Sequence, residues 1–296
     1  MLFYHNSCYA MGTRLNVVMV EPLLDGDFIF DQIVREVDRL ETKLSRFRAN
    51  SDVCLINENA AVQPVQVDDE MGKILSLCRD YYVRTHGTFD ITLPSKFLAR
   101  GTDTVPIRQK DVFSPSCWDD AIRFDLENLS VAFTNPFVQI DLGGFGKGYA
   151  IQKIAAIFKN SGIRNALVSF GESSVLAMGH HPYGDCWKIG LESDQQFDRP
   201  GHVFELTDQS ISTSGFQKRA DHSIGFHIIS PLTQRPVKAT SLIAVQSTDP
   251  LEAETLSTAL FATLDADTSF LDNFNDCHIV RIDCDKGQLL EICTNG

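Results

Sequence analysis

The residues that could do chemistry gather most densely in the stretch VQIDLGGFGKGYAIQK, which runs from Val138 to Lys153. Residues 138–141 predict a strand that ends at a carboxylate, Asp141, and apolar residues recur at helical spacing from Tyr149 onward. Lys147 lies between these segments among four glycines: Gly143, Gly144, Gly146 and Gly148. Glycines let backbone N–H groups approach an anion closely at a helix start, and lysine adds positive charge. The stretch therefore predicts a site for a phosphorylated ligand.

A plainer interpretation fits the same glycines. They also serve a tight connection between a strand and a helix, with Lys147 on the surface. The spacing is not that of a Walker loop, because Gly148 rather than Ser or Thr follows the lysine, and it is not GxGxxG. The glycines alone leave both interpretations open.

Composition limits the class of protein. A chain of 296 residues with 43% hydrophobic and 22% charged residues suits one large globular domain or two closely joined ones. The formal net charge of −13 argues against nucleic acid as a partner, because a phosphate backbone requires clustered Lys and Arg. The eight cysteines form no CxxC pair, so neither a zinc site nor a redox motif is predicted.

The sequence predicts no integral membrane segment. No apolar run approaches the roughly 20 residues of a membrane span. Residues 1–20 lack a basic segment followed by a continuous apolar core, so we expect no signal peptide and a cytoplasmic location.

Strands and helices are mixed without strict alternation, which favours an α+β fold over a doubly wound parallel sheet. Ile211–Gly215 is predicted to be a hydroxyl-rich turn, and Phe226–Ile229 a short strand. Pro94–Trp118 has no clear periodicity. The other main expected elements are strands at Tyr9–Glu21, Ala166–Phe170, Trp187–Leu191, His202–Leu206 and Leu242–Gln246, helices at Leu24–Leu44, Asp69–Thr85, Tyr149–Ser161 and Leu251–Leu264, and a closing hairpin at Cys277–Ile292.

Further polar residues are weak signals when each is taken alone. Asp90 and Thr92 suit an ordinary turn, and Asp141 suits the end of a strand. His227 stands beside two isoleucines and would more often be structural. Glu254 and Thr258 would form a solvated helix face.

Eight separated motifs, taken together, resemble those of one family in that family's order. Over nearly its whole length the chain resembles the flavin transferases of the ApbE type, also called FAD:protein FMN transferases. The matching stretches are MGT at 11–13, ETKLSRFRANSDVCLIN at 41–57, HGTFDITLPS at 86–95, IDLGGFGKGYAIQKI at 140–154, NALVSFGES at 165–173, STSG at 212–215, HIISPLTQRP at 227–236 and EAETLSTALF at 252–261.

The resemblance implies a fold and an activity. We expect one domain over residues 1–296, made of mixed, largely antiparallel sheets flanked by helices, with a flavin pocket between two closely packed lobes. The family binds FAD and, with a divalent ion such as Mg²⁺, transfers FMN to a Ser or Thr hydroxyl of an acceptor flavoprotein subunit and releases AMP. Its members are often periplasmic.

The resemblance also assigns roles to residues of this chain. It implies a metal held by the carbonyl of Gly146 with Glu254 and Thr258, which are four apart on one helical face. It implies His227 and Lys147 as catalytic residues. Lys147 is also among the residues expected to bind the flavin nucleotide, with Met11, Gly12, Ser45, Asp90, Thr92, Asp141, Gly143, Gly144, Gly171, Ser214 and Gly215.

The chain departs from the family pattern at several of these motifs. Glu254 replaces an Asp on the late helix, and Glu172 follows Gly171 where the family has a pair of glycines. In the pattern H-I-x-D-P-x-T-G, Ser230 replaces the Asp and Gln234 replaces the Gly. Two alternatives to the transferase therefore stay open: a protein that binds FAD without transferring FMN, and a pyrophosphatase that hydrolyses FAD to FMN and AMP.

Overall fold

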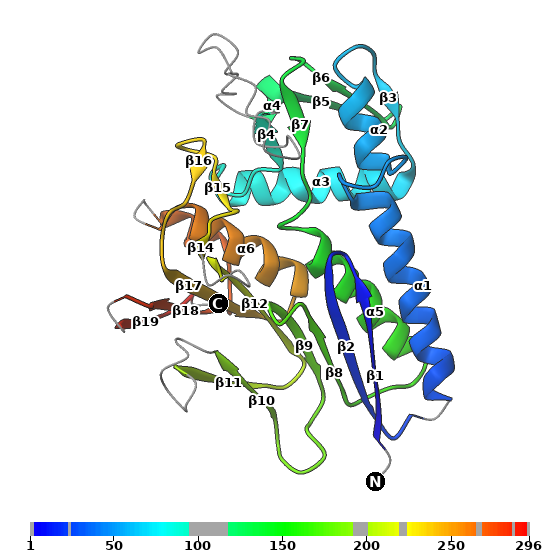
Figure 1. The fold of residues 1–296 in the computed structure, drawn as a ribbon, viewed down its shortest axis with the longest axis vertical. Coiled ribbons are helices and arrows are strands. Elements are labelled where there is room, and N and C mark those ends of the chain that lie inside the picture. The colour runs from blue at the N-terminus through cyan, green and yellow to red at the C-terminus, as the bar shows by residue number, and fades with distance from the viewer. Residues whose placement is uncertain are drawn as a thin grey trace.

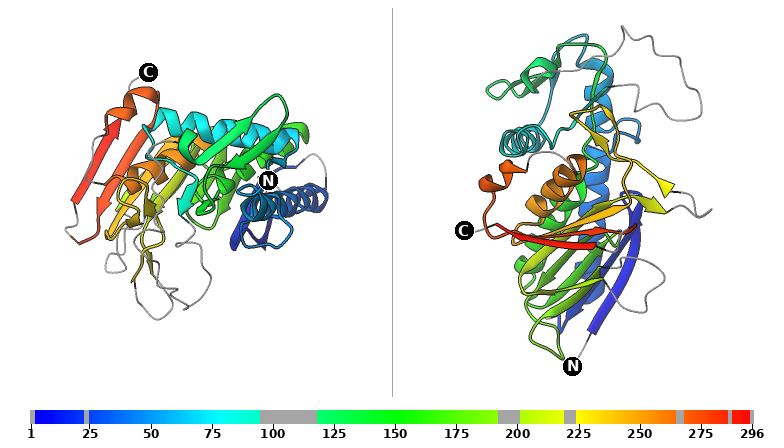
Figure 2. Two further views of the ribbon diagram at one scale, coloured as in Figure 1. Left: turned by 90° about the horizontal axis from the view of Figure 1, so that it is seen from above. Right: turned by 90° about the vertical axis from the view of Figure 1, so that its left-hand side faces the viewer.

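The computed structural model of the protein describes residues 3–22, 25–94, 118–191, 201–218, 224–264, 268–285 and 288–294. Its centre is an antiparallel sheet with helices on one face and a hairpin on the other (Figures 1 and 2). The strands of this sheet are β1 (Phe3–Ala10), β2 (Thr13–Val20), β8 (Ala166–Phe170), β9 (Ser174–Met178), β12 (Gln209–Gly215), β17 (Ser241–Ser247), β18 (His278–Asp283) and β19 (Gln288–Cys293). The helices are α1 (Gly26–Leu44), α2 (Asp52–Asn59), α3 (Asp69–Arg84), α4 (Trp118–Ala121), α5 (Gly146–Asn160) and α6 (Pro250–Ala262), with a 3-10 helix at Ser269–Asn273.

The large sheet joins the two ends of the described chain. Its strand order is β1-β2-β8-β9-β12-β17-β18-β19, and each neighbouring pair is antiparallel. The register brings Val17 of β2 opposite Val168 of β8, and Ser212 of β12 opposite Ser174 of β9. The N-terminal hairpin therefore lies in the same sheet as the late strands.

Helices α1, α5 and α6 form the layer over this sheet. α1 begins at an Asp25 cap and buries a stripe at helical spacing, which includes Ile29, Ile33 and Val37. α6 begins at an Asp249 cap followed by Pro250, a residue suited to the first turn of a helix. α6 is buried on nearly every side because it packs on β12 and β17 below and beside α5. Its polar residues are consequently enclosed.

The opposite face of the sheet is covered by the hairpin of β10 (Trp187–Leu191) and β11 (His202–Leu206). Trp187 and Phe204 from this hairpin pack with Ala177, Ala244 and Val280 of the sheet in a second apolar cluster. α3 lies across the far side of α6, as Figure 1 shows. The smaller sheets join β3 (Val65–Gln66), β6 (Ser130–Phe133) and β5 (Ile122–Asp125); β4 (Thr92–Pro94) and β7 (Val138–Ile140); β13 (Gln217–Lys218) and β14 (Ile224–Gly225); and β15 (Ile229–Ser230) and β16 (Arg235–Pro236).

The α+β class is confirmed, and several local predictions are corrected. The single expected strand at Tyr9–Glu21 is the second half of a hairpin that turns at residues 11–12. Ile211–Gly215 is not a turn but part of strand β12. The hydroxyls of Ser212 and Ser214 in this strand face α6, where they contact Glu254 and Ser257. Phe226–Ile229 is mostly loop, with the short strand β15 starting at Ile229. Most of the irregular stretch Pro94–Trp118 lies outside the described residues.

Within the described part of the chain, no helix has both the length and the apolar character needed to cross a membrane.

Candidate functional site

The glycine-rich stretch forms a tight turn that leads directly into α5. The side chain of Asp141 accepts a hydrogen bond from the N–H of Gly143 at 2.8 Å, and the carbonyl of Leu142 accepts from Gly146 at 2.8 Å. No side chain caps the helix at Phe145, and its first turn contains no acidic residue. The helix begins at Gly146, three residues before the predicted start, so Lys147 stands in the first turn. An uncapped helix start carries partial positive charge that suits an anion.

Asp141 is fixed from its other side by α1 and the loop after it. Its Oδ2 lies 2.8 Å from Nε of Arg46, whose guanidinium stacks on the ring of Phe47. Ser45 is the C-cap of α1, and its hydroxyl accepts from the N–H of Phe47 at 3.2 Å. Ser45 and Asp141, both predicted site residues, thus meet through Arg46, which the sequence did not single out.

Asp90 and Thr92 lie beside the strand that enters the glycine turn. β4 pairs with β7 so that Thr92 is opposite Ile140, and the N–H of Asp141 donates to the carbonyl of Ile91 at 2.8 Å. Asp90 accepts from both the N–H and the hydroxyl of Thr92, each at 2.7 Å. Burial of the carboxyl, offset only in part by these two donors, raises the pKa of Asp90 to about 6.

Glu254 is the buried charge of the site. Only 2% of the residue is exposed, and its carboxylate is held from three elements. Oε2 accepts from the hydroxyl of Ser174 on β9 at 2.6 Å and from that of Ser212 on β12 at 2.8 Å. Oε1 accepts from the ammonium of Lys147 on α5. A buried carboxylate requires such donors and a counter-charge, and the structure supplies both.

A chain of hydroxyls continues from Glu254 to Thr258. Ser257 donates to Ser212 at 3.1 Å and lies 3.0 Å from Ser214, whose Oγ is 3.5 Å from Oγ1 of Thr258. The glycine turn reaches the same place, because a Cβ added to Gly144 would lie 3.0 Å from the side chain of Thr258. The turn and the buried face of α6 are therefore in contact.

Gly148 sets the distance between α5 and α6. A Cβ at this position would lie 2.8 Å from Cβ of Glu254 and 2.8 Å from the carbonyl oxygen of Pro250. Any side chain would force the helices apart. This glycine serves helix packing, and the packing brings Lys147 within reach of Glu254.

The N-terminal hairpin turn and the turn after β8 meet at the edge of the site. Met11 and Gly12 form the hairpin turn, and the N–H of Met11 donates to Oε2 of Glu41 at 2.8 Å. Gly171 has φ +66, and a Cβ there would lie 2.7 Å from Oγ1 of Thr13. Glu172 also has positive φ, at 61°, so its backbone takes the conformation that a second glycine would adopt without strain.

His227 precedes the β15–β16 hairpin and lies near Lys147. The residue remains exposed, yet desolvation by neighbouring groups and then the positive charge of Lys147 lower the pKa of its imidazole. Ser230 is buried in β15, and its carbonyl accepts from the N–H of Gln234 at 2.8 Å. Gln234 has φ 52°, a left-handed conformation that favours glycine.

The predicted metal ligands match magnesium in chemistry, with one obstacle. Glu254 and Thr258 supply a carboxylate and a hydroxyl one helical turn apart, and magnesium is commonly bound by one or two carboxylates together with substrate phosphates. Gly146 lies in the first turn of α5 beside Lys147. Among the described residues, no three or more His, Cys, Asp or Glu side chains are grouped so that they could hold a metal ion. The obstacle is that the ammonium of Lys147 already occupies Oε1 of Glu254.

Three hydroxyls of the site, on Ser174, Ser212 and Ser257, were not among the predicted site residues. Ser212 and Ser214 alternate with Ile211 and Thr213, and strand alternation places them on one face of β12. Because residues 211–215 were predicted to be a turn, the alternation of serines along the strand was not recognised. Gly215 closes the same strand, where a Cβ would lie 2.5 Å from the side chain of Leu242.

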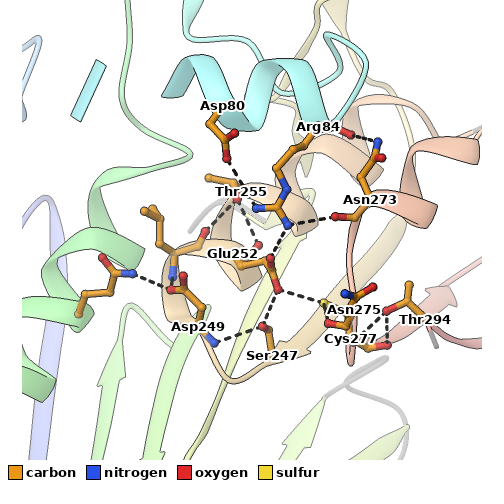
Figure 3. A network of polar contacts seen from close by, with 12 residues as sticks. Asp80, Arg84, Ser247, Asp249, Glu252, Thr255, Asn273, Asn275, Cys277 and Thr294 are labelled. Carbon is orange, nitrogen blue, oxygen red and sulfur yellow. Dashed lines mark hydrogen bonds and ion pairs between the residues drawn. The ribbon is translucent and has the colours of Figure 1, made fainter. Parts of the chain in front are cut away.

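A second carboxylate of α6, Glu252, belongs to a different network, drawn in Figure 3. Its Oε2 accepts from Arg84 of α3 at 2.7 Å, and its Oε1 accepts from Ser247 at 2.9 Å and lies 3.4 Å from the sulfur of Cys277. Arg84 also donates to the carbonyl of Asn273 at 3.2 Å. This network ties α6 to α3 and to the segment before β18.

The antiparallel sheet, its helical layer and the glycine turn against α6 define a class that known structures share. The ApbE protein from Thermotoga maritima superimposes with a TM-score of 0.81 at 24% identity, covering 98% of this chain and 96% of that one. The flavin transferase ApbE from Vibrio cholerae superimposes with a TM-score of 0.78 at 20% identity, covering 99% and 97%. These structures establish the likeness in fold.

The sequence places the chain within that class. The model of the ApbE family matches residues 11–278, and the chain belongs to the ApbE family. An FAD:protein FMN transferase from Chlamydia trachomatis is 24% identical over 309 residues, covering 96% of this chain and 95% of that protein. Another from Rhodobacter capsulatus is 30% identical over 210 residues, which are 68% of this chain and 40% of that protein.

Proposed function

We propose that the protein binds FAD and transfers its FMN part to a Ser or Thr hydroxyl of an acceptor protein, with Mg²⁺, and releases AMP. Membership of the ApbE family and relatives named FAD:protein FMN transferase support flavin transfer. The observation that carries the finer proposal is the contact between the start of α5 and Glu254 of α6. It joins groups suited to a pyrophosphate with a carboxylate suited to a cation.

The nucleotide is proposed to bind at the start of α5. The uncapped N–H groups there, with Gly143 and Gly144, suit the pyrophosphate, and Lys147 adds a charge-assisted contact. The remaining proposed flavin residues come from separate elements. They are Met11 and Gly12 at the hairpin turn, Ser45 and Asp141 around Arg46, Asp90 and Thr92 beside β7, Gly171 after β8, and Ser214 and Gly215 at the end of β12.

In the proposed reaction the acceptor oxygen attacks the phosphorus that bears the riboflavin. The bond from this phosphorus to the bridging oxygen breaks, and AMP leaves with the bridging oxygen. His227 takes the proton of the acceptor hydroxyl; its lowered pKa keeps the imidazole neutral near pH 7 and able to accept it. Lys147 balances charge that develops on the phosphate oxygens.

Glu254 and Thr258, with the carbonyl of Gly146, are proposed to hold Mg²⁺. A bound magnesium ion would withdraw charge from the phosphate oxygens. Ser174 and Ser212 fix the carboxylate of Glu254 through Oε2, and they accommodate a side chain one methylene longer than the family's Asp.

The test is incubation of the purified protein with FAD and Mg²⁺, with and without a pool of synthetic peptides that carry Ser and Thr. AMP and flavin-labelled peptide, measured by nucleotide chromatography and mass spectrometry, are the expected products. FMN and AMP without labelled peptide would establish the pyrophosphatase instead. FAD that binds and stays intact with every acceptor would establish a binding protein without transfer.

A further inference from the structure

The carboxylate of Glu254 already has three donors for its roughly four acceptor positions. Oε2 already accepts from two hydroxyls, on Ser174 and Ser212, and Oε1 accepts from Lys147. Ser174 and Ser212 are 1% and 2% exposed and stand on adjacent strands in the middle of the sheet, so their buried hydroxyls need Oε2 as an acceptor. A metal ion at Glu254 therefore requires Oε1.

Lys147 and a metal ion would compete for that oxygen. Two cations at one carboxylate oxygen repel each other, and a single buried carboxylate offsets only one positive charge. Without a metal ion, the ammonium of Lys147 supplies the counter-charge that the buried Glu254 needs. The lysine therefore holds the cation position in the free protein.

The ammonium of Lys147 can leave Glu254, and a ligand bound at the start of α5 would offer it a second partner. Its side chain is 23% exposed, against 3% for that of Glu254. It stands in the first turn of α5, where the backbone N–H groups have no side-chain cap. Its positive charge also contributes to the lowered pKa of His227, so the ammonium at the carboxylate lies near that imidazole as well. A phosphate bound at the helix start would offer the ammonium a new partner.

We propose that Lys147 blocks the cation position at Glu254 until a phosphate-bearing ligand draws its ammonium away, so that the divalent cation binds together with the nucleotide and not before it. This inference rests on the proposed function, because it takes Glu254 as the cation ligand and FAD as the nucleotide. It adds an order of binding: the nucleotide first opens Oε1, and the cation then replaces the lysine there.

The experiment measures binding of Mn²⁺ as the probe for the divalent cation, by calorimetry, with and without FAD. In the wild-type protein we expect FAD to tighten Mn²⁺ binding at least tenfold, and Mn²⁺ to tighten FAD binding by the same factor. In Lys147→Met we expect Mn²⁺ to bind without FAD at least tenfold more tightly than it binds the free wild-type protein. The effect of FAD on Mn²⁺ affinity should fall accordingly.

Three further variants control this measurement. Lys153→Met removes a lysine of the same helix, which lies 3.3 Å from Glu70, and should leave Mn²⁺ binding unchanged. Lys147→Gln keeps a neutral donor for Oε1 if the Met variant folds poorly, and should also bind Mn²⁺ without FAD. Lys147→Met combined with Glu254→Ala should lose the added Mn²⁺ affinity.

The inference is overturned if Lys147→Met and Lys147→Gln bind Mn²⁺ no better than the free wild-type protein. It is also overturned if the free wild-type protein already binds Mn²⁺ as tightly as it does with FAD. Failure of the proposed function looks different: FAD then does not bind, or no AMP is released, whatever the Mn²⁺ affinity.

Discussion

Glu252 and Glu254 stand two residues apart on α6, and each accepts from a basic residue of another helix and from serine. Glu252 binds Arg84, whose guanidinium is also tied to Asn273, in a network that joins α3, α6 and the segment before β18 (Figure 3). Glu254 binds Lys147, which stands in the first turn of α5 and has a side chain that is 23% exposed. Similar ion pairs on one helix are therefore distinguished by what else the cation can bind. Arg84 has several protein partners, while Lys147 pairs with Glu254 and stands in the uncapped first turn of α5.

Replacement at Glu254 should give the largest effect on activity. Glu254→Ala removes the proposed cation ligand, and we expect AMP release from FAD to fall by at least about a hundredfold at every Mg²⁺ concentration. Glu254→Asp keeps the charge and should retain more turnover than the Ala variant. A magnesium titration of AMP release measures both. Turnover of the Ala variant equal to that of the wild type would refute the assignment of Glu254 as a ligand.

Glu252→Ala should break the second ion pair, between Glu252 and Arg84. It removes the acceptor of Ser247 and the strongest ionic partner of Arg84. Arg84 then keeps its contacts with Asn273 and Asp80 and with the rings of Tyr81 and Phe274. We expect a loss of about 1–3 kcal/mol in the free energy of unfolding, with AMP release per folded protein unchanged. Denaturant unfolding with a parallel turnover assay is the measurement. If Glu252→Ala lowered AMP release as much as Glu254→Ala does and left stability unchanged, Glu252 would also belong to the active site.

A third carboxylate, Asp90, sharpens the contrast because its two donors both come from neutral Thr92. The pKa of Asp90 is raised to about 6 in the folded protein. The raised pKa makes protonation stabilise the fold at low pH, and this contribution is lost as the pH rises through 6. Asp90→Asn should thus raise the free energy of unfolding by about 3 kcal/mol at pH 8 and by little at pH 4. Thermal unfolding across this range tests it; an effect independent of pH would contradict it.

The smallest expected effect comes from a matched pair of serine variants. Ser212→Ala removes one donor of Glu254, and Ser247→Ala removes one donor of Glu252. Each should cost about 1 kcal/mol of stability. Only Ser212→Ala should also weaken Mn²⁺ binding in the presence of FAD, because it loosens the carboxylate. If neither variant changed the Mn²⁺ affinity, Ser212 would not be needed to position Glu254, and Ser174 alone would suffice.

Local patterns predicted much of the fold, and the site only in part. The stripe of α1 was visible because amphipathic helices repeat at 3.6 residues. The first hairpin strand and β12 were missed, since both are rich in polar residues that are also common in turns. The Lys147–Glu254 contact joins residues far apart in sequence, and no periodicity reports such a pair. Glu172 and Gln234, which stand where the family pattern has glycine, both have positive φ, and the sequence alone did not predict this.

The strand order of the large sheet has a consequence for synthesis of the protein. β2 pairs with β8, so that Val17 meets Val168, and at ribosomal speed β8 emerges roughly ten to thirty seconds after the first hairpin. During that time the hairpin has an open edge that chaperones must shield or other nascent chains can join. Glu254 and Thr258 emerge later still. The proposed cation site therefore cannot form before these late residues emerge, and flavin cannot guide the early steps of folding.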